Sequence, residues 1–304
     1  MKLIKITPRG FCDGVIHSWK LILDAKRDYP NSNIYLLGWF VHNKEFLNTL
    51  LSDHLFLLDD TKATRYELIK NTKFKDDDVV ILSAHGTDWK TIELLENKKI
   101  KYIDTTCKYV YSTHYKLKEA IAQDLTIGFI GKKNHPETSA CVAISEKISL
   151  ITNLEELSEF CLKNKDKKIS FFNQSTLSIY DLYDFYKYIK ENCKNYILNN
   201  DICNATQIRQ EALINLDYNV DLVLVVGDQR SNNSKSLCKI AKSKFRNAYL
   251  IANVREINLD WFKNVKSIAI TSGASTLTKT TNDVIEYLIS VFNIKPEEII
   301  DAKK

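Results

Sequence analysis

The chain has 304 residues, of which 44% are hydrophobic, so it is long enough for two or three domains with proper cores. It contains no apolar run of about 18 residues and reaches Pro8-Arg9 before a signal-peptide core could form, which argues against a membrane span and a secretory leader and predicts a cytoplasmic protein. The net charge of +5 comes mostly from scattered lysines, and no basic stripe interleaved with aromatic residues is found, so we expect no nucleic-acid partner. Seven cysteines without paired spacing argue against a disulfide framework.

Short apolar runs predict buried strands along the whole chain. They lie at 3–6, 33–38, 78–85, 101–104, 125–130, 169–172, 196–198, 222–226 and 268–270. Amphipathic stretches between them predict helices, including those at 15–25, 107–123 and 281–292. The run at 78–85 has the apolar centre that is typical of a parallel sheet covered on both faces. The alternation of strands and helices therefore predicts an α/β fold.

Three cysteines divide this pattern into similar parts. Cys107 follows Cys12 by 95 residues, and Cys203 follows Cys107 by 96. The strand that follows each cysteine ends at a glycine, and these glycines lie 26, 24 and 24 residues after the three cysteines. A side chain that can form hydrogen bonds stands four residues beyond each glycine. The glycines are Gly38, Gly131 and Gly227, and the side chains are His42, His135 and Ser231. A second polar loop recurs less regularly, with His85, Ser175 and Ser275.

The repeat predicts three copies of one α/β unit. We assign repeat 1 to 13–106, repeat 2 to 107–202 and repeat 3 to 203–304, the last joined by the N-terminal strand at 1–12. Because the period is about twice that of a solenoid repeat, we expect three small domains in a pseudo-threefold arrangement rather than a stacked array. Ligands of α/β sheets bind at the carboxyl ends of the strands, so the polar loops of all three units should face one central cavity.

Cys12 stands between a predicted strand and a predicted helix. The amide hydrogens and the dipole at a helix start favour an anion, so we expect this cysteine to be thiolate-prone. The repeat adds Cys107 and Cys203, and three thiolates should converge. A zinc ion with three sulfur ligands is one interpretation, but three cysteines from separate units better suit an inorganic cluster, and a cluster of four irons would keep one iron without a protein ligand.

Around these cysteines the repeat predicts a ring of hydrogen-bond donors that suits a phosphorylated group. Its members are His42, His85, His135, Ser231, Asn233 and Ser275. Glu137 is the carboxylate attached to the ring, and beside an anionic ligand it could deliver a proton, although a glutamate in the first turn of a helix is also favourable for dipole reasons. For Cys141, Cys161, Cys193 and Cys238, which lack the repeated spacing, we expect core packing.

Several motifs carry a resemblance to a known family. They are Pro8-Arg9-Gly10-Phe11-Cys12, Val41-His42-Asn43, Ser83-Ala84-His85-Gly86, Thr106-Cys107, His135-Pro136-Glu137, Gln174-Ser175-Thr176-Leu177-Ser178, Ile202-Cys203-Asn204-Ala205-Thr206 with Arg209-Gln210, and Gly273-Ala274-Ser275. Together, and over nearly the whole chain, they resemble the LytB or IspH family of hydroxymethylbutenyl diphosphate reductases, which act last in the non-mevalonate isoprenoid pathway.

The resemblance implies a three-domain trefoil around a central 4Fe-4S cluster, held by Cys12, Cys107 and Cys203. It implies that the diphosphate is bound by His42, His85, His135, Ser231, Asn232, Asn233 and Ser275. Glu137 and Ser175 would supply protons as a C–O bond breaks and water leaves, giving isopentenyl or dimethylallyl diphosphate. A ferredoxin- or flavodoxin-type protein would donate the electrons, and no membrane partner is expected.

The chain also departs from the family pattern. Asp13 stands where the resemblance leads us to expect alanine, and Asn232 where it leads us to expect a hydroxyl; Ser175 replaces a threonine but keeps the hydroxyl. The acidic Asp13 beside a cluster cysteine should lower the reduction potential. Two alternatives to the reductase remain at this point: a non-catalytic iron-sulfur sensor of oxidation or iron on the same scaffold, and a zinc-dependent hydrolase.

Overall fold

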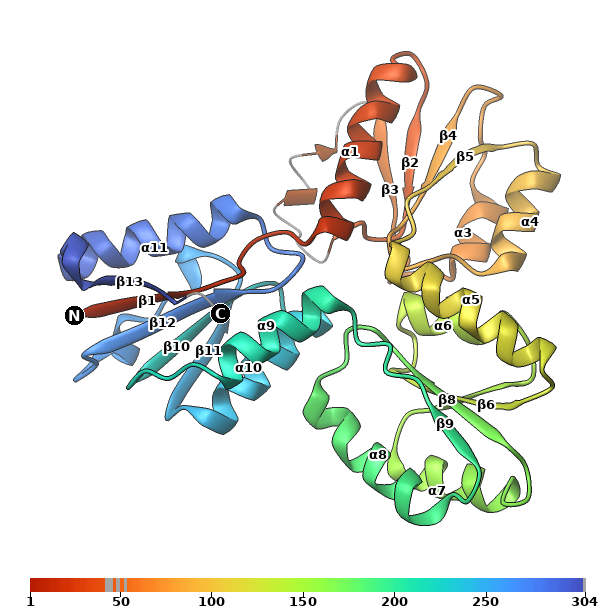
Figure 1. Cartoon of the computed structure of the whole chain (residues 1–304). Helices are drawn as coiled ribbons and strands as arrows, with labels where there is room; N and C mark the ends of the chain where they lie inside the picture. Colours follow the sequence, from red (N-terminus) through yellow and green to blue (C-terminus); the bar gives the residue numbers. More distant parts are fainter. Residues whose placement is uncertain (42–45, 48–49, 52–53, 303–304) are drawn as a thin grey trace.

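The computed structural model describes residues 1–41, 46–47, 50–51 and 54–302. The chain forms three separate sheets flanked by helices, arranged around a common centre (Figure 1). All strand pairings recorded in these sheets are parallel. The predicted α/β fold with three parallel units is thereby confirmed.

Each sheet has the same strand order at its core. The first sheet has the order β3-β2-β4-β5, and the second has the order β7-β6-β8-β9. The third has the order β11-β10-β12-β1-β13, so that the first strand of the chain completes the last sheet. The strands are β1 (Lys2–Ile6), β2 (Ile34–Leu37), β3 (Leu55–Leu58), β4 (Val79–Leu82), β5 (Lys101–Asp104), β6 (Thr126–Ile130), β7 (Ile148–Ile151), β8 (Ile169–Asn173), β9 (Tyr196–Leu198), β10 (Leu222–Val226), β11 (Asn247–Ile251), β12 (Ser267–Ser272) and β13 (Ile299–Ala302).

Helices connect the strands, as parallel pairing requires. They are α1 (Asp13–Asp28), α3 (Arg65–Asn71), α4 (Trp89–Asn97), α5 (Lys108–Ala122), α6 (Pro136–Val142), α7 (Leu154–Lys163), α8 (Ile179–Asn192), α9 (Asn204–Ile214), α10 (Asn232–Lys244) and α11 (Thr278–Phe292). Short 3₁₀ turns lie at η1 (Val254–Glu256), η2 (Leu259–Phe262) and η3 (Pro296–Glu298). Across the described residues, no helix is both long and apolar enough to cross a membrane.

The third sheet shows why these strands read as apolar runs. On β10, Val223 and Val225 pack into one core, whereas Leu222, Leu224 and Val226 pack into another on the opposite face. All of them are 0% exposed. Full burial of such a side chain stabilises the fold by roughly 1.5–3 kcal/mol, so a central strand covered on both sides favours apolar residues on both faces.

Four strands were not predicted from the sequence: β3, β7, β11 and β13. The first three occupy the same edge of their sheets, next to β2, β6 and β10. Edge strands have one partner and are partly exposed, as in β7, where Ser149 is exposed and Leu150 is only partly buried. The strand β13 extends only the third sheet, by pairing with β1. The predicted repeat boundaries each enclose one sheet, and they stay a proposal.

The four cysteines outside the repeat differ in their environments. Cys141, Cys161 and Cys238 are buried, in agreement with core packing. Cys193 is only partly buried, follows the last residue of α8, and has its Sγ 2.8 Å from the Sγ of Cys161. Core packing therefore describes three of these four side chains, and Cys193 instead lies at the edge of the core.

Candidate functional site

The three repeated cysteines occupy equivalent positions. Each is the N-cap of a helix, namely α1, α5 and α9, and each follows the fourth strand of its sheet, namely β1, β5 and β9. These three helices begin near the centre of the molecule (Figure 1). The side chains of Cys12, Cys107 and Cys203 line one cavity of about 100 Å³. The predicted convergence of the cysteines is therefore found in the structure.

The chain around Cys12 is fixed by contacts with the third sheet. The amide of Gly10 donates to Ser272 Oγ at 2.8 Å, and the amide of Cys12 donates to the carbonyl of Ala274 at 2.9 Å. Gly10 has a φ of +79°, a conformation that other residues rarely adopt. Because Ser272 is the last residue of β12 and Ala274 follows it closely, the sheet that contains β1 also positions the loop that carries Cys12.

Gly14 keeps the space between two thiols open. A Cβ added at Gly14 would lie 2.8 Å from Cys107 Sγ and 3.9 Å from Cys12 Sγ. A distance of 2.8 Å is shorter than a carbon–sulfur contact allows, so a larger residue at this position would displace Cys107. Glycine at 14 therefore lets the first turn of α1 approach a cysteine from the next unit.

Burial governs the ionisation of the thiols. It raises the pKa of Cys107, and the charges of Cys12 and Glu137 raise it further. Burial likewise raises the pKa of Cys203 to about 11, although hydrogen bonds with Thr206 oppose the change. At these two positions the cost of burying a charge exceeds the stabilisation from the helix start. A bound cation reverses this balance because it stabilises the thiolate.

The donor set fits an iron-sulfur cluster. Cysteine thiolates are the ligands that such clusters prefer, and here they come from three units that surround one cavity. The Arg209 guanidinium lies near Cys12 and Cys203, where it could balance the charge of a thiolate-bound cluster. In the part of the chain that the structure describes, no three His, Cys, Asp or Glu side chains are arranged to hold a single metal ion.

Two predicted histidines lie side by side in the cavity. His85 follows β4, and His135 is the N-cap of α6. Their rings meet edge to face, with centroids 5.7 Å apart and an interplanar angle of 87°. His135 is 8% exposed. The first and second units thus bring two imidazole rings to the same wall, where both can face an anion.

The third unit contributes hydroxyl and amide groups. Ser231 caps α10 and accepts a hydrogen bond from the amide of Ser234 at 3.3 Å, while Ser275 Oγ donates to Ser231 Oγ at 3.3 Å. Asn233 Nδ2 donates to Thr206 Oγ1 at 3.1 Å, and Asn233 Oδ1 accepts from the amide of Ala274 at 3.0 Å. These contacts hold the polar groups at the positive end of α10, where an anion is favoured.

Glu137 and Ser175 form a buried pair. Glu137 is 1% exposed, and its Oε1 accepts from the Ser175 amide at 2.7 Å while its Oε2 accepts from Ser175 Oγ at 2.9 Å. Burial raises the pKa of Glu137 to about 7, although both hydrogen bonds from Ser175 oppose the change; the charge of Asp201 adds to it. The carboxyl group can therefore hold or release a proton near neutral pH.

Most of the predicted site residues lie together. Those in the described chain all line the same cavity: Cys12, His85, Cys107, His135, Glu137, Ser175, Cys203, Ser231, Asn232, Asn233 and Ser275. His42 lies outside the described residues, so its predicted place in the ring stays a prediction.

Three residues that contact the site or its loops, Thr206, Lys132 and Arg209, had no role predicted from the sequence. The Thr206 hydroxyl accepts from Asn233 and lies 3.1 Å from Cys203 Sγ, so it links a cysteine to the donor ring. Lys132 Nζ donates to Asn232 Oδ1 at 3.0 Å and thereby connects the second and third units. Thr206 could have been found from its position three residues after Cys203, in the first turn of α9. The contact of Lys132 could not, because its partner lies 100 positions away in the sequence.

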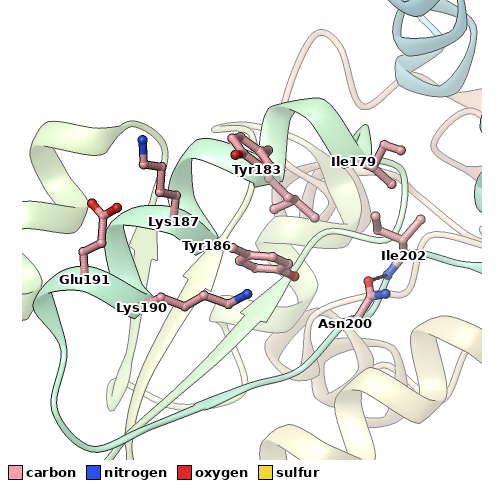
Figure 2. A pocket seen from close by; sticks show the side chains of 9 residues that line it. Ile179, Tyr183, Tyr186, Lys187, Lys190, Glu191, Asn200 and Ile202 are labelled. Atoms are coloured by element: carbon pink, nitrogen blue, oxygen red, sulfur yellow. Dashed lines mark hydrogen bonds between the residues drawn. The ribbon is translucent and has the colours of Figure 1, made fainter.

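A larger cavity of about 360 Å³ lies elsewhere, along α8 and the segment before Cys203 (Figure 2). Its wall includes Tyr183, Tyr186, Lys187 and Lys190 from α8. It is larger than the central cavity, which would favour it as a binding site if size were the criterion. The smaller central cavity is nevertheless the better candidate, because it gathers thiols, imidazole rings and a buried carboxyl group, which the wall on α8 does not contain.

The chain is similar to known proteins over nearly its whole length. A family model described as LytB protein matches residues 3–289. A 4-hydroxy-3-methylbut-2-enyl diphosphate reductase from Malacoplasma penetrans (strain HF-2) is 44% identical over 291 residues, which cover 95% of this chain and 97% of that protein. A reductase with the same name from Geobacillus sp. (strain WCH70) is 36% identical over 292 residues, which cover 95% of this chain and 90% of that protein.

A solved structure is similar in fold as well. The E-1-hydroxy-2-methyl-but-2-enyl-4-diphosphate reductase from Plasmodium falciparum aligns with a TM-score of 0.85 and 27% identity, covering 100% of this chain and 92% of that one. The family resemblance inferred from the motifs is thereby confirmed. Since the family model spans the units that carry all three cysteines, and relatives match at 44% and 36% identity, this chain belongs to the LytB family.

Proposed function

We propose that this protein catalyses the reductive dehydroxylation of (E)-4-hydroxy-3-methylbut-2-enyl diphosphate to isopentenyl and dimethylallyl diphosphate, the last step of the non-mevalonate pathway. Its relatives are named as reductases of this diphosphate, and the chain is an oxidoreductase of their family. The observation that carries the proposal is a buried carboxyl group, Glu137, in the same cavity as three cysteines.

The donor ring would bind the diphosphate. His85, His135 and Ser231 could donate hydrogen bonds to its oxygens, together with Asn232, Asn233 and Ser275, and we assign His42 to the same ring. Hydrogen bonds to a charged group contribute about 1.5–3 kcal/mol each. Because the donors come from different units, they would hold the diphosphate in one orientation and so fix the position of the reacting hydroxyl at the other end of the substrate.

The LytB family uses an iron-sulfur cluster, and we assign its ligands in this chain to Cys12, Cys107 and Cys203. A 4Fe-4S cluster held by three thiolates would supply electrons one at a time and keep one iron open toward the cavity. The sheet arrangement supports three units bounded at 13–106, 107–202 and 203–304 with 1–12, each of which contributes one ligand. Gly14 would leave the room that this arrangement requires.

Glu137 would supply the proton that the leaving oxygen needs. Reduction of the C–O bond consumes two electrons and two protons and releases one water molecule. One proton converts the departing hydroxyl group into water, and the other adds to carbon at either end of the allyl group, which gives the two products. With a pKa of about 7, Glu137 is partly protonated at neutral pH, and the Ser175 hydroxyl bonded to it could pass the proton on.

We propose that the electrons come from a ferredoxin- or flavodoxin-type protein in the cytoplasm. The mildly basic chain, with a formal charge of +5, suits an acidic carrier of this kind. Such a donor delivers one electron at a time, which suits a 4Fe-4S cluster because the cluster accepts electrons singly.

The test is reduction of (E)-4-hydroxy-3-methylbut-2-enyl diphosphate by the anaerobically reconstituted protein, with dithionite and a viologen as electron source. We expect isopentenyl and dimethylallyl diphosphate, with about four irons bound per chain. A protein that binds the cluster but forms neither product would instead be an iron-sulfur sensor. The buried Glu137–Ser175 pair favours the enzyme, since a sensor has no use for a proton donor in its ligand cavity.

A further inference from the structure

Arg209 is a buried cation behind the cysteine cavity. Its side chain is 3% exposed. The Nη1 group donates to the carbonyl of Ala205 in the first turn of α9 at 2.9 Å, and the Nη2 group donates to the carbonyl of Gly10 at 2.8 Å. One guanidinium therefore joins the loop before Cys12 to the helix that begins after Cys203.

Carboxylate pairing does not explain this burial. The other buried guanidinium, Arg65, is 8% exposed and forms a salt bridge with Asp60 at 3.0 Å. Within the described chain, Arg209 forms no salt bridge, and its buried Nε has no hydrogen-bond partner. Carbonyl groups do not neutralise a buried positive charge, so a nearby anion is expected to compensate it.

The negative charges that act on Arg209 are those of Cys12, Cys203 and Asp13. Burial lowers the pKa of Arg209, whereas the negative charges of Cys12, Cys203 and Asp13 oppose that change. Asp13 is exposed in the first turn of α1, next to Cys12. Because Asp13 is exposed, water screens much of the balance that its carboxylate could supply to Arg209. Two thiolates would give the guanidinium its compensating charge.

We propose that Arg209 is a positioning residue that stabilises the anionic form of the cysteine-bound cluster, and that Asp13 opposes it, so that the two charges together set how easily the cluster is reduced. The inference rests on the proposed function for the presence of a cluster. Reduction adds a negative charge to the cluster, and a fixed cation nearby favours that step while a fixed anion disfavours it. The exposed Asp13 should act more weakly than the buried Arg209, because water screens its charge.

The same residue should also hold the ligand loops. Groups that hold metal ligands in place by hydrogen bonds commonly contribute 10- to 100-fold to metal affinity. Arg209 reaches both Gly10 and Ala205, so its loss would loosen two of the three ligand positions at once. A role in loop geometry alone, however, predicts no change of reduction potential in variants that keep the cluster.

The test compares anaerobically reconstituted variants by two measurements that do not need turnover: the midpoint potential in a spectroscopic titration, and the rate of iron release to a chelator. We expect Arg209→Met and Arg209→Gln to have more negative potentials and roughly tenfold faster iron release than the parent protein. Arg209→Lys should stay closer to the parent in potential, since it keeps the charge, and Asp13→Asn should shift the potential in the positive direction. Arg27→Met, which removes an exposed cation from the far end of α1, is the matched control and should leave the potential unchanged.

Unchanged potentials in Arg209→Met or Arg209→Gln with the cluster bound would overturn the inference. If neither neutral variant retains a cluster, the potentials of Asp13→Asn and Arg209→Lys test the inference instead. A potential of Asp13→Asn equal to that of the parent would contradict the proposal that Asp13 opposes Arg209. Failure of the parent protein itself to bind a cluster would count against the proposed function instead, so the two failures are distinguishable.

Discussion

Two opposing effects act on the proton of Glu137. Desolvation favours the neutral acid, whereas the Ser175 amide and hydroxyl stabilise the carboxylate; the raised pKa of about 7 shows that desolvation outweighs the hydrogen bonds. A carboxyl group in this balance can donate a proton to a leaving group and regain it from solvent near neutral pH. The same side chain also fits the dipole at the start of α6, so the two interpretations of Glu137 in the sequence are compatible.

Replacement of Glu137 by glutamine should abolish most turnover while the cluster and the substrate still bind. Glutamine has a similar shape but cannot donate an acidic proton, and loss of a general acid costs roughly 10²- to 10⁴-fold in rate. The measurement is kcat with dithionite and a viologen, alongside iron content and substrate affinity. Turnover close to that of the parent would mean that another group delivers the proton.

Glu137 should also make the stability of the cluster-free protein depend on pH. Its pKa is about 7 in the folded protein and 4.5 in the reference state, so its contribution is fully present below pH 4.5 and is lost as the pH rises through 7. The size of the loss is about 3 kcal/mol. Urea unfolding at pH 5 and pH 8 should show a larger fall for the parent than for Glu137→Gln. Equal falls in both proteins would place the titrating group elsewhere; Asp201, whose pKa burial also raises, is the next candidate.

Cys107 and Cys161 offer a matched pair for the ligand assignment. Cys107→Ser should lose the cluster, because serine is a poor iron ligand and only two thiolates remain. Cys161→Ser should keep iron and visible absorbance, since Cys161 lies on α7, is buried in the core of the second unit and contacts Cys193 at the end of α8. Iron analysis after anaerobic reconstitution checks both, and equal losses would contradict the assignment.

At the residue scale, sequence spacing predicted the site residues that recur in all three units. The cysteine intervals of 95 and 96 predicted three side chains that the structure brings to one cavity. Arg209 and Lys132 occur once each, and their importance lies in contacts with Gly10 and Asn232, at separations of 199 and 100 positions. Such contacts depend on how the three units pack against one another, which a local sequence pattern cannot predict.

At the element scale, the start of α10 combines two roles in one hydroxyl. Ser231 accepts from the amide of Ser234 and so caps the helix, and it also lines the cavity. Loss of an N-cap costs about 1 kcal/mol of stability wherever it occurs. The helix start additionally favours an anion, so this cap lies where a diphosphate is expected.

Ser231→Ala should therefore lower both stability and substrate affinity. We expect about 1 kcal/mol of destabilisation and roughly a tenfold rise in KM, with kcat changed less, because the lost hydrogen bond acts on the diphosphate rather than on the reacting bond. Asn153→Ala is the control, since Asn153 caps α7 by accepting from the Glu156 amide at 2.9 Å and does not line the cavity. A KM unchanged by Ser231→Ala would remove Ser231 from the ring.

The strands show what periodicity can and cannot predict. Among the central strands, β10 was predicted to the residue, because it is covered on both faces and apolar throughout. The predicted run at 78–85 extends three residues beyond β4, and β12 is longer than the predicted 268–270 because it includes buried Ser267, Thr271 and Ser272. The edge strands β3, β7 and β11 were missed. The strand β11 begins with a partly exposed Asn247 and includes Tyr249, and such a mixture of polar and apolar residues is also common in loops.

At the scale of the whole molecule, the first strand completes the last sheet. The strand β1 lies between β12 and β13, so the third unit receives its fourth strand, and with it Cys12, from the start of the chain. This closes the arrangement of the units: the chain passes through all three and returns to the sheet where it began. Each cysteine also links one unit to the next, because it follows a strand of one sheet and begins a helix that leads to another.

Cluster binding should consequently stabilise the molecule as a whole. The three ligands come together only when all units are folded and in contact, so the cluster binds the native state and not the unfolded chain, and its binding free energy adds to stability. A gain of a few kcal/mol corresponds to a rise in Tm of roughly 5–10 °C for a chain of this size. Scanning calorimetry under anaerobic conditions, before and after removal of the cluster by oxidation and chelation, measures the difference. Cys107→Ser should unfold at the temperature of the cluster-free parent with or without reconstitution; a cluster-loaded parent with the same Tm as the cluster-free one would mean that the ligands do not hold the three units together.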